Sequence, residues 1–244
     1  MEHQDFLDQA QVQYRALRTA VITAGPGTPV PTCPAWDVSG LVRHLAGVSS
    51  LVLGALTGPV DGGPPEPESP PEDWEELVTW WQDRFTAVNR VLAGASADTP
   101  AWTPSGPPVA GFWSRRQAHE LAVHRLDAEH AVHGPEVPPL LFDTPFAADG
   151  VDEFFTAVLT RTARERPVER SGRVLWHAAD AGRTWELRLT AGEPPVTGPA
   201  TGAATDHDTT VAGTADALYR AAWGRPSGAI VSGDRSLLDA LPRP

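Results

Sequence analysis

Hydrophobic residues recur every three or four positions along the first half of the chain, a period that is typical of amphipathic helices. The first such segment is 4–24, with apolar positions Leu7, Ala10, Tyr14, Leu17 and Val21. The second covers 37–56, and the Asp37 carboxylate can cap its first turn. The third begins near Pro71 and repeats tryptophan, leucine, valine and phenylalanine as far as Leu92.

The fourth helical segment is 113–134, which contains neither proline nor glycine before its last residue. Gly134 and Pro135 predict its end, because glycine adopts the left-handed cap and proline cannot continue the helical hydrogen bonds. Four helices of this length, separated by long proline- and glycine-rich segments, predict a four-helix bundle joined by crossovers.

The pattern changes after Gly134. A helix is expected to begin at Thr144–Pro145 and to run to about residue 166. Two alternating runs, 173–178 and 184–190, flank a short glycine-containing turn and predict a β-hairpin. The remaining elements are expected to be a strand at 208–213, a helix at 214–223, a strand at 229–232 and a helix at 236–241. We therefore predict two domains, a bundle over 1–137 and an α+β domain over 138–244.

Composition narrows the class of partner. The 244 residues carry a formal net charge of −12, which disfavours binding to nucleic acid or to an anionic membrane. We see neither a signal peptide nor an apolar stretch long enough to span a bilayer, so we expect a soluble, cytoplasmic protein. Cys33 is the single cysteine, which excludes an internal disulfide and a cysteine-based zinc site. We interpret it as a packed small side chain rather than a nucleophile.

A candidate metal site comes from three polar residues on predicted helices. Glu120 and His124 are four residues apart, so both side chains reach the same side of one helix. His44 lies one turn from apolar neighbours on the second helix and is expected to lean inward. Two imidazoles and a carboxylate suit zinc with one open coordination position, and they also accept other divalent transition metals. The alternative is an ordinary polar pair on a helix surface.

Other polar residues near these positions have simpler interpretations. Asp127, one turn beyond His124, either orients that imidazole from behind or is solvated. His3 and His207 are expected to be solvated.

Two sequence blocks then resemble a known family. They are T-C-P-A-W-D-V-S-G-L-V-R-H-L-A-G-V (32–48) and R-R-Q-A-H-E-L-A-V-H-R-L-D-A-E (115–129). Together they resemble the signature blocks of the mycothiol-dependent maleylpyruvate isomerase family of actinobacteria, within the DinB-like metalloprotein superfamily. The segments 211–225 and 230–234 resemble that family's second domain.

The resemblance implies a DinB-like four-helix bundle that holds one divalent metal, usually zinc, through His44, Glu120 and His124. It also implies a small α+β C-terminal domain related to sterol carrier proteins. An arginine of that domain binds the anionic substrate in the isomerase, and we match Arg225 to it; the alternative is a structural arginine.

The implied function is that of a mycothiol-dependent metalloenzyme whose metal-activated thiolate acts on a small, electrophilic, anionic substrate. The reaction would be a cis–trans isomerisation of the maleylpyruvate type or a thiol S-transfer. The expected partners are the substrate and a low-molecular-weight thiol, with the protein a monomer or a dimer. The alternatives are a non-catalytic metal- and ligand-binding protein, a metal-dependent hydrolase, and a structural protein whose triad is accidental.

Overall fold

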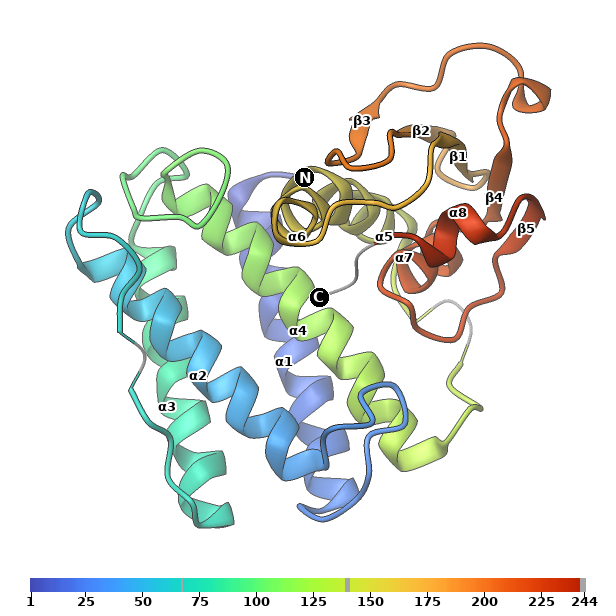
Figure 1. The fold of residues 1–244 in the computed structure, drawn as a ribbon. Coiled ribbons are helices and arrows are strands. Elements are labelled where there is room, and N and C mark those ends of the chain that lie inside the picture. The colour runs from blue at the N-terminus through green and yellow to red at the C-terminus, as the bar shows by residue number, and fades with distance from the viewer. Residues whose placement is uncertain (67, 139–140, 242–244) are drawn as a thin grey trace. The chain divides into compact units, whose positions relative to one another are not determined.

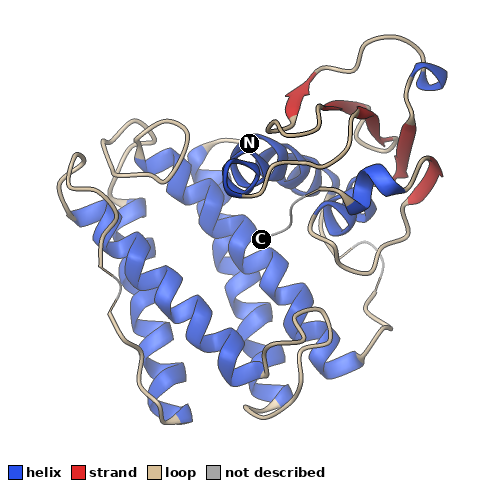
Figure 2. Ribbon diagram, viewed as in Figure 1, coloured by secondary structure: helices blue, strands red, loops and turns tan. Residues whose placement is uncertain are grey.

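The computed structural model describes residues 1–66, 68–138 and 141–241. The chain divides into two compact units, Met1–Val137 and Pro138–Pro244. The first is built from long helices, and the second combines helices with a small sheet (Figures 1 and 2). This confirms the predicted fold class, a helical bundle followed by an α+β unit.

Four long helices form the N-terminal unit: α1 (His3–Ala24), α2 (Val38–Thr57), α3 (Trp74–Ala93) and α4 (Ala110–His133). The Asp37 carboxylate accepts a hydrogen bond from the Gly40 amide at 2.8 Å and caps α2, as predicted. Asp73 caps α3, so that helix begins at Trp74, near Pro71 as predicted. Helix α4 ends at His133, followed by Gly134 as predicted. The φ of 67° at Gly134 is positive, as glycine allows, but its ψ of −139° lies outside the left-handed helical region that the sequence predicted. Helix α4 begins three residues earlier than predicted, at Ala110.

The helices associate in two main pairs, with α1 packed along α4 and α2 packed along α3 (Figure 1). Long connections join consecutive helices, in agreement with the predicted crossovers. The core is apolar, and its fully buried side chains include Leu17, Leu41, Leu45, Leu77, Trp81, Leu121 and Leu126. Burial of this apolar surface is the main force that holds the four helices together.

Helix α2 is the most apolar of the four long helices. Its 20 residues, with a mean hydropathy of 1.4 in the most apolar window, are long and apolar enough to cross a membrane by length and composition. Arg43 and His44 interrupt its apolar run. Half of that window is buried inside the protein, where α2 packs mainly against α3.

The C-terminal unit begins with a helix that runs from α5 (Thr144–Glu153) through a π-helical stretch, η1 (Phe154–Leu159), into α6 (Thr160–Glu165). The sequence predicted one regular helix here and gave no sign of the π-helical turn. Both Phe154 and Phe155 are buried, and they contact different tryptophans, Trp223 and Trp176 respectively. The π-helical turn interrupts the regular α-helical spacing at these two residues, and both adjacent aromatic rings enter the core.

The sheet has five strands in the order β3-β2-β1-β4-β5. β1 (Gly172–Ala178) and β2 (Arg183–Leu189) form the predicted antiparallel hairpin, and β4 (Thr209–Gly213) pairs with β1 in parallel. β5 (Ile230–Gly233) pairs antiparallel with β4. The edge strand β3 (Val196–Gly198) was not predicted, because prolines lie on both sides of it. The helices α7 (Ala215–Ala222) and α8 (Ser236–Asp239) lie at the predicted positions.

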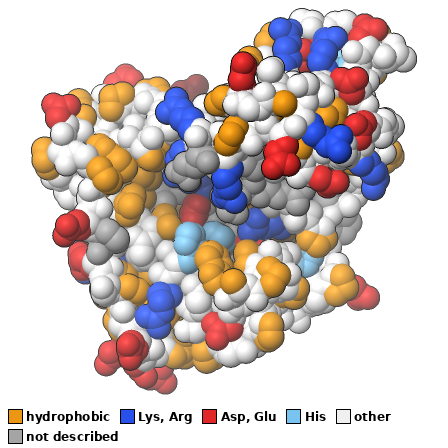
Figure 3. All heavy atoms as spheres, in the orientation of Figure 1, with side chains coloured by type: hydrophobic (Ala, Val, Ile, Leu, Met, Phe, Trp, Pro, Cys, Tyr) orange, Lys and Arg blue, Asp and Glu red, His pale blue; other side chains and the backbone are white. Residues whose placement is uncertain are grey.

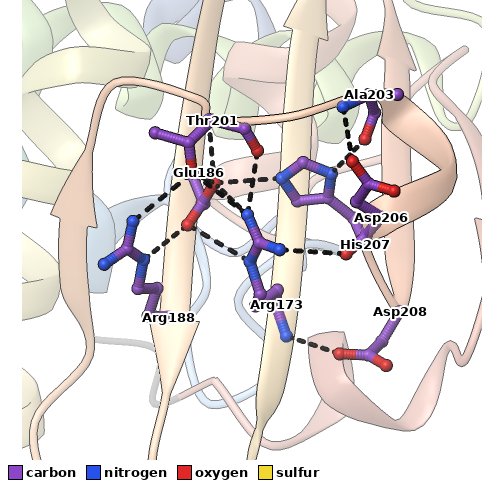
Figure 4. Close-up of polar contacts among 8 residues, drawn as sticks. All are labelled: Arg173, Glu186, Arg188, Thr201, Ala203, Asp206, His207 and Asp208. Carbon is purple, nitrogen blue, oxygen red and sulfur yellow. Dashed lines mark hydrogen bonds and ion pairs between the residues drawn. The ribbon is translucent and has the colours of Figure 1, made fainter.

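One face of this sheet carries a buried carboxylate. Glu186 of β2 is 1% exposed and lies within hydrogen-bond distance of Arg173, Arg188, Thr201 and His207 (Figure 4). The His207 side chain is fully buried, and its Nε2 lies 3.1 Å from Glu186 Oε2. Thr201 and His207, which belong to the connection between β3 and β4, therefore attach that connection to β2 through Glu186.

Two histidines contradict their predicted solvation. His207 is buried in the cluster just described. His3 is half-buried, with Nδ1 2.9 Å from Ser114 Oγ and Nε2 3.0 Å from the Leu92 carbonyl oxygen. Both lie in polar sequence surroundings, and their partners Ser114, Leu92 and Glu186 are far away along the chain, so the local pattern gave no indication of burial.

Candidate metal centre

His44, Glu120 and His124 come together in the N-terminal unit. One ligand atom from each lies within 4.8 Å of the other two. The two Nε2 atoms face the same carboxylate oxygen, since Glu120 Oε1 lies 2.9 Å from His44 Nε2 and 3.3 Å from His124 Nε2. The three donor atoms that the sequence predicted as ligands thus point toward one another.

The helices explain this convergence. The four-residue spacing places Glu120 and His124 on the same side of α4. Helix α2 contacts α4, and its buried residues Leu41 and Leu45 orient the helix so that His44 leans toward that side. The triad is partly accessible, because the His44 side chain is 34% exposed, whereas Glu120 and His124 are 13% and 10% exposed. Histidine side chains are visible on the surface of the helical unit (Figure 3).

The negative charge of Glu120 and the positive charges of His124 and Arg116 stabilise one another. Burial tends to raise the pKa of Glu120, but His124 and Arg116 lower it well below its usual range. Burial tends to lower the pKa of His124, yet the Glu120 charge and a hydrogen bond with Asp127 raise it to about 9. Arg116 Nη2 donates to Glu120 Oε2 at 2.6 Å and so leaves Oε1 directed at the imidazoles.

Asp127 lies behind His124 and is completely buried. Its Oδ2 is 2.8 Å from His124 Nδ1. Of the two interpretations that the sequence left open, solvation is therefore wrong, and Asp127 is in position to orient the imidazole. An Nδ1–H directed at a carboxylate leaves the Nε2 lone pair available for a cation, which is the usual arrangement behind a metal-bound histidine.

Sequence reasoning missed that three residues of the loop before α2 lie close to the triad or to Asp127 behind it. Thr32 Oγ1 donates to Asp127 Oδ1 at 2.5 Å, and the Cys33 thiol lies 3.6 Å from Asp127 Oδ2. Cys33 is half-buried, consistent with a packed side chain. The Trp36 ring centre lies 4.9 Å from that of His44 and 5.9 Å from that of His124. The proximity of this loop to the triad in space is not visible in the local sequence pattern.

The donor set fits a small divalent cation. Two ligands of a tetrahedral zinc ion, each at about 2.1 Å, are separated by about 3.4 Å. The two nitrogen–oxygen distances of 2.9 and 3.3 Å are slightly shorter, so small side-chain movements would open the space that a cation needs. Two imidazole nitrogens and one carboxylate oxygen also leave a fourth position for a further ligand.

Arg225 belongs to the C-terminal unit, whereas the triad belongs to the helical unit. Its Nη1 donates to the Trp223 carbonyl oxygen at 2.7 Å. It lines a cavity of about 380 Å³ together with Trp176, Ser227 and Arg235. This places a cationic group at a partly apolar cavity of the size that binds small molecules.

Comparison with known proteins gives two family matches. Residues 7–129 match the model described as "Mycothiol maleylpyruvate isomerase N-terminal domain", and residues 145–240 match the "MDMPI C-terminal domain". No protein in a curated set of sequences matches the chain significantly.

Two solved structures have a similar fold. The crystal structure of the mycothiol-dependent maleylpyruvate isomerase is 14% identical to this chain, with a TM-score of 0.59, and the match covers 95% of this chain and 93% of that one. A histidine-to-alanine mutant of that isomerase matches with the same TM-score and coverage, at 13% identity. At identities of 13–14%, these two matches show a shared fold and do not show a shared reaction.

Proposed function

The chain belongs to the mycothiol maleylpyruvate isomerase family, and from that premise we propose that it is a mycothiol-dependent metalloenzyme. The observation that carries the proposal is the convergence of His44, Glu120 and His124 on one point in the helical unit. A divalent cation bound there, with zinc the best fit to the donor set, would lower the pKa of a thiol at its open position.

The chain's own residues prepare the site. Arg116 binds one oxygen of Glu120 and directs the other toward the two imidazoles. Asp127 holds His124 with Nε2 facing the centre of the triad. Glu120 and His124 are largely shielded from water, whereas His44 is the most exposed of the three side chains, so we propose that thiol and substrate approach beside His44.

The proposed reaction is addition of a thiolate to an electron-poor double bond. The thiolate sulfur forms a bond to one carbon, and the π-electron pair moves onto the conjugated carbonyl oxygen. The former double bond then rotates as a single bond. Collapse of the enolate restores the carbonyl and the double bond, now in the trans configuration, and expels the thiolate unchanged. A thiol S-transferase would share the first step and keep the sulfur–carbon bond.

We propose that Arg225 binds the anionic group of the substrate. A guanidinium can bind a carboxylate through two parallel hydrogen bonds, which orients the substrate as well as attracting it. Replacement of Arg225 by glutamine should then raise KM for an anionic substrate by tenfold or more, with a smaller effect on kcat. An unchanged KM would remove Arg225 from this role.

The decisive experiment is a thiol titration of the Co²⁺-loaded protein. Binding of mycothiol sulfur to cobalt should produce an intense charge-transfer absorption in the near ultraviolet. S-methyl mycothiol, which has no thiol proton to lose, should not produce it. If cobalt binds but mycothiol leaves the spectrum unchanged, thiol activation is wrong, and activation of water or simple ligand binding becomes the better account.

A further inference from the structure

The loop between α1 and α2, residues 25–37, is held in one conformation by its own backbone. The Cys33 amide donates to the Val30 carbonyl at 2.9 Å, and the Trp36 amide donates to the Cys33 carbonyl at 2.8 Å. The Val30 amide donates to the Trp36 carbonyl, and the Val30 side chain is 1% exposed. The loop is therefore an anchored structure that can fix the position of a neighbouring group.

The group it contacts is the Asp127 carboxylate. Thr32 Oγ1 donates to Oδ1, and Oδ2 lies beside both His124 Nδ1 and the Cys33 thiol. The hydroxyl and the imidazole therefore bind the two different oxygens of one carboxylate. This arrangement restricts rotation of the carboxylate, and with it the direction in which the His124 ring can point.

We propose that Thr32 is a positioning residue of the metal centre, acting through Asp127 to hold His124 in the orientation that ligates a cation. The proposal rests on the proposed function, since it requires that the triad binds a divalent cation. Groups behind a ligating histidine commonly change metal affinity by 10- to 100-fold when they are removed. Thr32 is one step further away, and its contact is a short hydrogen bond to a buried charge, so we expect an effect of about tenfold.

The test compares three variants of the full chain in Zn²⁺ titrations against a chromophoric chelator. Thr32→Val keeps the branched shape and removes the hydroxyl, whereas Thr32→Ser keeps the hydroxyl. Thr28→Val is the matched control, because Thr28 lies in the same loop and its hydroxyl binds the Ala24 carbonyl instead. We expect about tenfold weaker zinc binding in Thr32→Val and affinities near wild type in the other two.

A double-mutant cycle separates positioning from general damage to the loop. Asp127→Asn should weaken zinc binding at least as much as Thr32→Val does. If Thr32 acts through Asp127, adding Thr32→Val to Asp127→Asn should cause little further loss. If the two losses multiply instead, Thr32 acts by another route and the proposal is overturned.

Trp36 reports where the cation binds. Because its ring lies beside both imidazoles, Co²⁺ in the triad should quench its fluorescence. The quenching should decrease in Trp36→Phe, and in Thr32→Val it should require about tenfold more cobalt. This measurement also applies if Thr32→Val lowers the overall stability, provided that its circular dichroism spectrum is native at the temperature used.

The outcomes distinguish the two proposals. Zinc binding by the wild type with an unchanged affinity in Thr32→Val overturns the positioning role and leaves the proposed function intact. Absence of zinc and cobalt binding by the wild type overturns both.

Discussion

Replacement of Glu186 by glutamine tests how the β3–β4 connection is held on the sheet. The Glu186 oxygens accept hydrogen bonds from Arg173 Nη2 at 2.9 Å, Arg188 Nε at 2.5 Å, and the amide and hydroxyl of Thr201, both at 3.0 Å. Hydrogen bonds from Arg173 and Arg188 help to hold the pKa of this carboxyl far below its ordinary value, although desolvation opposes them. Glutamine removes the charge and directs an amide N–H₂ toward these donors.

The size of the effect follows from burial. Removing one partner of a buried ion pair typically costs about 3–5 kcal/mol. The Arg173 and Arg188 side chains are 36% and 58% exposed, so water can solvate them again once the charge is lost. We therefore expect a loss of about 2–4 kcal/mol in the free energy of unfolding, below the fully buried case.

The assay is urea unfolding followed by circular dichroism, together with hydrogen exchange of the β1 and β2 amides. The exchange measurement matters because it reports on the C-terminal unit alone. Glu193→Gln is the matched control, since Glu193 is exposed on the same unit. If Glu186→Gln stays within about 0.5 kcal/mol of wild type, the cluster does not stabilise the unit and the reasoning from burial fails.

Three further predictions follow from the same structure. Folding lowers the pKa of Glu186, so the carboxylate stabilises the folded state above its unfolded pKa, and this stabilisation is lost as the pH falls through the folded pKa. The unfolding free energy of Glu186→Gln should therefore depend less on pH under acidic conditions than that of the wild type. In the metal-free protein the pKa of His124 is raised to about 9, so a metal ion must displace its proton. The zinc affinity should therefore fall about tenfold per pH unit below pH 9. A zinc affinity that does not change between pH 7 and 9 would contradict this. Gly134→Ala forces a side chain onto a residue with φ of 67° and ψ of −139°, and it should lower the unfolding free energy, measured by thermal melts, by about 1–3 kcal/mol. Ala131→Gly, a change within α4, is the comparison that tests helix propensity alone.

The long helices could be predicted because their evidence is local. Apolar residues at intervals of three and four, an Asp37 cap and a terminating Gly134 all lie within the segments that they define. The same locality explains why Glu120 and His124 were recognised as a pair. The π-helical turn at Phe154–Leu159 could not be predicted, because its residues have the same apolar pattern as an ordinary helix.

The residues that complete the site depend on contacts between distant segments. Thr32 and Asp127 are 95 positions apart, and the 2.5 Å contact between them exists only because the loop before α2 folds against α4. His207 was predicted to be solvated for the same reason, since its partner Glu186 lies on a strand 21 positions earlier. Sequence patterns identify which faces are apolar, but polar partners across elements become visible only in the fold.

The most direct test of the central claim is the zinc content of the purified protein after loading with Zn²⁺ and removal of excess metal. The wild type should retain about one zinc ion per chain, and His44→Ala, Glu120→Ala and His124→Ala should each lose it. His133→Ala is the matched control, because His133 lies on α4 with a side chain that is 53% exposed, and this variant should retain the metal. A wild type without zinc, or triad variants that keep it, would contradict the account.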